Sequence, residues 1–158
     1  MKPVDLLALL REFYRDTRAL RERHEAGARV TRQYDFNNTY QYVICREDRH
    51  LSWLRQAIES MGGTVPEAAA PGEAGRGVAA GASQDDARET QALVERWHGR
   101  CQAVSDARHL RMLNVILGEA REHTRFFDQM AAGQTSLLGR GTSGPEVRGN
   151  VLPTRWVE

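Results

Sequence analysis

The feature that most constrains this chain is the repetition of apolar residues at the spacing of one helix face. Four segments show it, and each is long enough for an amphipathic helix. The ends carry suitable signals: Pro3 fits a first turn, the pair Gly62-Gly63 fits a helix C-terminus, and Asp106 fits an N-cap. Gly27 is read as the end of the first helix. We expect an all-α fold with helices at about 3–25, 36–61, 83–104 and 106–132.

The connections between these segments predict the topology. Residues 62–82 read GGTVPEAAAPGEAGRGVAAGA and hold no large apolar side chain, so this stretch is expected to be a flexible connector. The other two connections are short, which predicts two antiparallel hairpins, 1–61 and 83–132. A long connector between hairpins is typical of a four-helix bundle with one crossover connection. Residues 1–132 are therefore expected to form a single domain.

The remaining residues, 133–158, read as an extended C-terminal tail. The stretch 133–149 is rich in Gly, Ser and Thr, which is typical of a flexible linker. The end of the chain is apolar and stiffened by proline, and Trp and Arg are favoured anchors of interfaces. We interpret it as a docking peptide for a protein partner, and the alternative is that it folds back onto its own bundle. The docking residues would be Leu152, Pro153, Arg155 and Trp156.

Charge and composition exclude some classes of function. The net charge of the 158 residues is +1, which argues against nucleic-acid binding. No apolar run is long enough to span a membrane, and the N-terminus mixes charges among its leucines, unlike a secretory signal. The two cysteines, Cys45 and Cys101, lie far apart and form no CxxC pair, so a reducing cytoplasm is expected.

Four polar residues lie within or at the edge of the apolar stripes. Side chains at these positions are expected to face the core of the bundle and not the solvent. Glu47 lies at the middle of the second stripe, and His50 follows one turn later. In the last segment His123 lies within the stripe and Glu119 at its edge. Glu and His side chains three or four residues apart share a helix face and can chelate one cation. A buried carboxylate otherwise needs a partner, so the alternative for Glu47 is a hydrogen-bonded pair with His or Arg.

The second segment resembles the second helix of ferritin-like and rubrerythrin-like proteins. The resemblance rests on Glu47-Asp48-Arg49-His50 followed by Leu54, Ile58 and Met61-Gly62-Gly63. It implies a dinuclear iron or manganese site in which Glu47 and His50 form the first Glu-x-x-His and His123 the second histidine. The activity implied is that of a di-iron oxidoreductase or ferroxidase, with no catalytic residue beyond the metal ligands.

The ligand set that this resemblance requires is incomplete. Ala120 stands where the second Glu-x-x-His needs its carboxylate, with Glu119 beside it. The helix positions that should supply the other carboxylates are near Thr17 and Thr90. Three explanations of the incomplete set are open. The helices are rotated relative to the ideal helical wheels used to place the residues, or the site holds one metal, or the site is vestigial. Tyr40, two turns before Glu47, is a candidate hydrogen-bond donor to the ligands.

Three further expectations concern the role of the bundle, its oligomeric state and two other histidines. The bundle is alternatively a non-catalytic adaptor or cargo protein that docks onto a larger assembly through its tail. Tyr42, Trp53 and Leu9 lie outside the main stripes, which suggests a homodimer or higher oligomer. His24 and His109 are assigned to packing or capping near the bundle ends.

Overall fold

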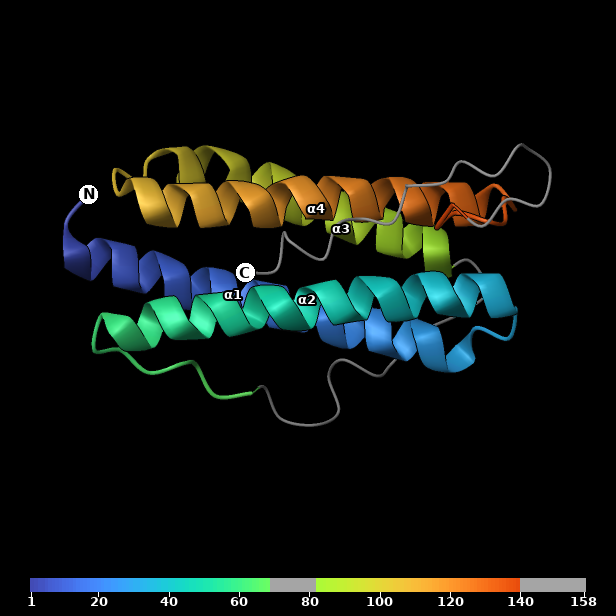
Figure 1. Cartoon of the computed structure of the whole chain (residues 1–158), viewed down its shortest axis with the longest axis horizontal. Coiled ribbons are helices and arrows are strands. Elements are labelled where there is room, and N and C mark those ends of the chain that lie inside the picture. Colours follow the sequence, from blue (N-terminus) through green and yellow to red (C-terminus); the bar gives the residue numbers. More distant parts are fainter. Residues whose placement is uncertain (69–81, 140–158) are drawn as a thin grey trace.

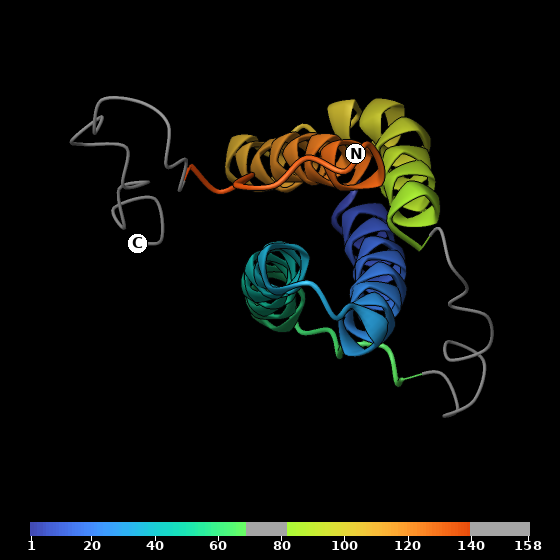
Figure 2. The same cartoon turned by 90° about the vertical axis from the view of Figure 1, so that its right-hand side faces the viewer.

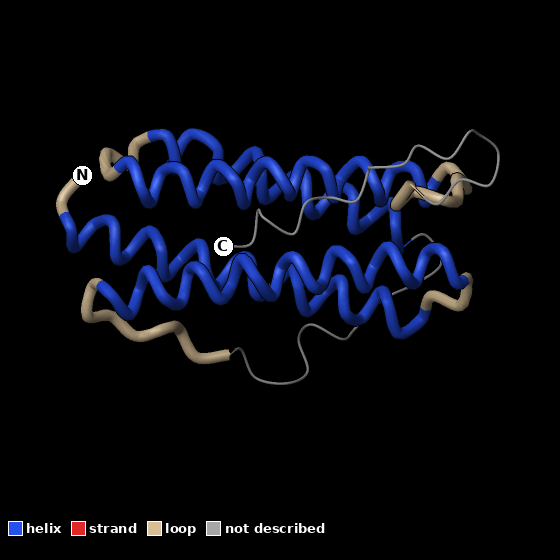
Figure 3. Tube along the Cα trace, in the orientation of Figure 1, coloured by secondary structure: helices blue, strands red, loops and turns tan. Residues whose placement is uncertain are grey.

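The computed structural model describes residues 1–68 and 82–139, and all its regular structure is helical (Figures 1 and 3). No strand occurs in the described part of the chain, so the expected all-α class is confirmed. The helices are α1 (Pro3–Val30), α2 (Tyr34–Ser60), α3 (Ala82–Gln102) and α4 (Ala107–Ala131).

The helices form two antiparallel hairpins, α1 with α2 and α3 with α4, as the short connections predicted. Seen end-on, α1 also lies beside α3, and α2 beside α4 (Figure 2). Helix α2 ends at the opposite end of the bundle from the start of α3 (Figure 1), which is what a crossover connection requires. The first residues after α2 turn back along α1, where the Arg18 guanidinium donates a 2.8 Å hydrogen bond to the Pro66 carbonyl.

The helix ends follow the local signals in the sequence with one exception. Asp106 caps α4 by accepting a hydrogen bond from the His109 amide, and Gly62 follows α2 with a φ of +78°. The expectation that α1 ends at Gly27 is wrong, because α1 continues to Val30. Gly27 is buried inside the helix, and a Cβ built on it would lie 2.9 Å from the Tyr40 ring. This glycine therefore permits a close approach of α2 and does not terminate α1.

We expect Gly27→Ala to destabilise the protein by about 1–3 kcal/mol, the usual cost of overpacking a core. The Tyr40 ring cannot easily move away, because its hydroxyl is fixed by a hydrogen bond to Asp86. Gly118→Ala is the matched control, since nothing lies within 4 Å of its added Cβ. The free energy of unfolding of that control should rise by about 0.5–1 kcal/mol, because alanine has the higher helix propensity. Urea unfolding of both variants measures the difference, and equal effects would show that the Tyr40 contact carries no cost.

Two apolar clusters fill the bundle, one toward each end. The larger surrounds Phe13 and Trp97, whose ring centroids are 4.9 Å apart. The smaller includes Val43, Phe127 and Met130. Along every helix, buried polar residues occupy the level between these clusters. The fold therefore places a polar layer at mid-bundle, enclosed by apolar packing on both sides.

Candidate functional site

The polar layer contains most of the residues singled out in the sequence. Glu47, His50 and His123 are each no more than 3% exposed, and the Glu119 side chain is 29% exposed at the edge of the layer. His24 joins them with no exposed surface at all. Its assignment to a bundle end is wrong, because α1 is longer than expected and places this residue in the interior.

His24 is the partner of Glu47. The His24 Nδ1 and Glu47 Oε1 atoms are 2.6 Å apart, and His24 Nε2 lies 3.2 Å from the Thr90 hydroxyl. The Thr90 hydroxyl donates to the Asp86 carbonyl at 2.6 Å, so it accepts from His24. One proton is then shared between His24 Nδ1 and the Glu47 carboxylate. This is the buried Glu–His pair that the sequence left open as an alternative to metal ligation.

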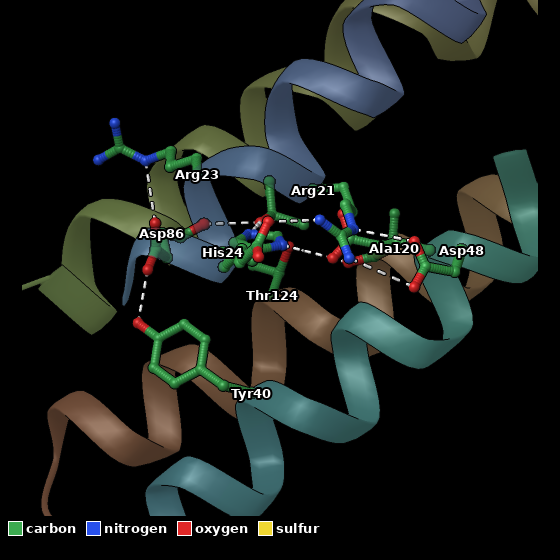
Figure 4. Close-up of polar contacts among 11 residues, drawn as sticks. Arg21, Arg23, His24, Tyr40, Asp48, Asp86, Ala120 and Thr124 are labelled. Atoms are coloured by element: carbon green, nitrogen blue, oxygen red, sulfur yellow. Dashed lines mark hydrogen bonds and ion pairs between the residues drawn. The ribbon is translucent and has the colours of Figure 1, made fainter. Parts of the chain in front are cut away.

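A second group of contacts converges on Asp86 in α3. Tyr40 donates to its Oδ2 at 2.5 Å, and Arg23 donates to its Oδ1 at 2.9 Å (Figure 4). Burial, followed by the negative charge of Asp86, raises the pKa of the Tyr40 phenol. The Tyr40 hydroxyl therefore contacts Asp86, and it reaches Glu47 only through Asp86, Thr90 and His24. The sequence did not single out Asp86 as a site residue; its i, i+4 spacing with Thr90 was the available signal.

His50 and Glu119 meet across the interface between α2 and α4. His50 Nε2 is in direct contact with Glu119 Oε2, and Arg46 donates to Glu119 Oε1 at 2.6 Å and to Oε2 at 3.2 Å. Burial raises the pKa of the Glu119 carboxyl, but the hydrogen bonds from His50 and Arg46 outweigh it and leave that pKa at about 2. Glu119 is therefore ionised at neutral pH. Arg46 was not foreseen, because its position in the sequence lies beside the apolar stripe of α2.

His123 lies next to this pair. Its ring is stacked on that of His50 with 6.3 Å between centroids. Burial, then the nearby His50 and His24, lower the pKa of His123 to about 3, so its imidazole is neutral near pH 7. No hydrogen bond reaches this ring from any residue within 1–68 or 82–139. Its neighbours are the aromatic rings of Tyr42 and Phe126.

The four expected ligands thus divide into two groups: Glu47 with His24, and His50 and Glu119 with His123 beside them. As the side chains stand, no three His, Cys, Asp or Glu groups in the described residues are arranged to hold a metal ion. The donor set does not fit a dinuclear centre, since Thr17 and Thr90 occupy the positions of the missing carboxylates. The Thr17 hydroxyl is buried and has no hydrogen-bond partner among the residues that the structure describes.

A groove between α2 and α4 gives access to Glu119. It has a volume of about 540 Å³ and extends from Glu119 toward the N-terminus of α4. Trp53 forms part of its wall, and the Trp53 ring also packs against His50 with 5.6 Å between centroids. The site is therefore buried on the His123 side and open on the Glu119 side.

The fold and the site together define this protein as an all-α four-helix bundle with a polar centre. No protein family, curated protein or solved structure matches the chain. The described helices include none that is both long and apolar enough to cross a membrane. The expected docking residues Leu152, Pro153, Arg155 and Trp156 lie outside the described residues, so the partner assigned to the tail stays a prediction. The expectations of an oligomer and of a cytoplasmic location are likewise still predictions.

Proposed function

We propose that this protein binds one divalent transition-metal ion at mid-bundle, with His50, Glu119 and His123 as ligands. The observation that carries the proposal is the almost fully buried, neutral imidazole of His123, which is stacked beside the contact between His50 and the Glu119 carboxylate. Glu119 and His123 are four residues apart on α4 and so share a face. His50 faces them from α2.

Two imidazoles and one carboxylate are a ligand set suited to zinc or to non-haem iron. A metal held by only three protein ligands keeps open positions, where it can polarise a bound ligand or activate water. We infer a single ion because Glu47, the other buried carboxylate of this layer, is already paired with His24. The proposal keeps three of the four expected ligands and reduces the dinuclear site to a mononuclear one.

The surrounding residues support this arrangement. Arg46 binds Glu119 Oε1 at 2.6 Å, which orients the carboxylate so that Oε2 faces His50. The Arg46 guanidinium in turn lies over the Trp53 ring, 6.0 Å from its centroid. Such outer contacts fix the orientation of ligands and usually contribute to metal affinity.

The test is metal content after reconstitution. Chelator-treated protein is loaded separately with Zn²⁺, Fe²⁺, Mn²⁺ or Co²⁺, desalted and subjected to elemental analysis. We expect one equivalent of at least one metal per chain. His50→Ala and His123→Ala should each lower affinity by more than about 100-fold, since even outer-shell partners contribute about 10- to 100-fold.

Glu47→Gln is the control that separates one metal from two. Glutamine can still accept a hydrogen bond from His24, so the variant should fold and retain its metal. Two equivalents per chain that fall to one or none in Glu47→Gln would favour the dinuclear site. Negligible metal in the unmodified protein would contradict the proposal.

A further inference from the structure

The groove between α2 and α4 has the size and lining of a small-molecule site. Its volume of about 540 Å³ lies within the range of about 300–1,000 Å³ that is usual for such sites. The walls are mainly apolar and include Trp53, Ala57, Met112 and Val115. Val115 is 42% exposed, an unusual exposure for a large apolar side chain. These walls favour a ligand with an apolar body.

The end of the groove remote from Glu119 is cationic. Arg108 and Arg111 line it and are exposed to solvent. Neither guanidinium forms an ion pair with any residue in the described ranges, 1–68 and 82–139. The one acidic residue among those that line the groove is Glu119, which is already ion-paired with Arg46 and in contact with His50. The groove is thus complementary to a negatively charged group at its arginine end.

The spacing along α4 sets the length of the occupant. Arg111 and Arg108 precede Glu119 by roughly two and three helical turns, or about 12 and 16.5 Å along the helix axis. A guanidinium binds a carboxylate through two parallel hydrogen bonds. An occupant that bonds to these arginines can therefore place its apolar part along the walls and its far end near Glu119.

We propose that this groove binds an amphipathic monoanion, such as a medium-chain carboxylate, with its charge on Arg108 and Arg111. This inference rests on the proposed function, because the apolar end of the bound monoanion would lie next to the proposed metal. It names the ligand class of that same site. Charge complementarity and the apolar walls favour this occupant over a second copy of the chain or the chain's own tail.

The test is calorimetric titration of the full chain with octanoate, and with octan-1-ol as the uncharged analogue of the same chain length. The double variant Arg108→Gln/Arg111→Gln should weaken octanoate binding by at least about tenfold, the loss of one charge-assisted hydrogen bond or more. Binding of octan-1-ol should not change. The control variant Arg88→Gln/Arg125→Gln removes two exposed arginines outside the groove and should bind octanoate normally.

The outcomes separate this inference from the metal proposal. Chelator-treated protein should still bind octanoate, because the arginines and apolar walls remain. Metal content should be unchanged in Arg108→Gln/Arg111→Gln. Absence of octanoate binding, or equal weakening by both double variants, would overturn the inference whatever the metal content. A dimer that Val115→Asp converts to a monomer would also overturn it, by showing that a second copy covers the groove.

Discussion

Glu47→Ala is expected to destabilise the metal-free protein by about 3–5 kcal/mol, the usual cost of removing one partner from a buried ion pair. Both side chains of the pair are almost inaccessible, with 0% of the His24 side chain and 4% of that of Glu47 exposed. Without Glu47, His24 Nδ1 has no acceptor in an apolar interior. Urea unfolding of chelator-treated protein measures the loss.

Three control proteins make this result interpretable. Glu47→Gln retains an acceptor for His24 and should lose much less stability than Glu47→Ala. The double variant His24→Leu/Glu47→Leu should recover much of the loss, since apolar residues often replace a buried pair without cost. Glu89→Ala removes an exposed carboxylate and should have little effect. If Glu47→Ala and Glu89→Ala are equally stable, the His24–Glu47 pair does not hold the centre of the bundle together.

Acid should destabilise the metal-free protein through His123. The pKa of this imidazole is lowered from 6.5 to about 3 in the folded state, first by burial and then by His50 and His24. As the pH falls below about 6.5, His123 is protonated in the unfolded chain but stays neutral in the folded chain. Stability is therefore fully present above that pH and is lost progressively down to about pH 3. At about pH 5 the loss from this group is about 2 kcal/mol.

His123→Leu isolates this contribution. The variant has no proton to bind at this position, so its unfolding free energy should vary less between pH 7 and pH 5. Glu119 does not interfere in this window, because its pKa is about 2 in the folded state and its contribution is lost only at lower pH. Equal pH dependence in both proteins would show that His123 takes up its proton as readily in the folded chain as in the unfolded one.

The sequence predicted the fold well because its signals are local. Apolar periodicity marked the helices, and the residues after Met61 indicated a crossover. The same periodicity predicted the burial of Glu47, His50 and His123, since a residue within an apolar stripe has to face the core.

The sequence could not assign partners within the polar layer. A helical wheel shows which face of one helix a residue occupies, but not which residue of a neighbouring helix lies at the same level. Glu47 was predicted to bind a metal because it lies at the middle of an apolar stripe in a Glu-x-x-His pair, whereas His24 was predicted to lie near a bundle end. Arg46 and Asp86 were missed for a related reason. Arg46 lies beside the apolar stripe of α2, whereas Asp86 lies in line with the stripe of α3 near the start of that helix, and only the packing of two helices shows that they reach Glu119 and Tyr40.

The central claim, a single metal on His50, Glu119 and His123, is tested most directly by anomalous X-ray diffraction from crystals grown with the metal that the protein retains. We expect one anomalous peak in the bundle, about 2.0–2.2 Å from a nitrogen of each histidine and an oxygen of Glu119. Glu47 should still be paired with His24. An empty bundle centre, or a metal bonded to Glu47, would contradict the account.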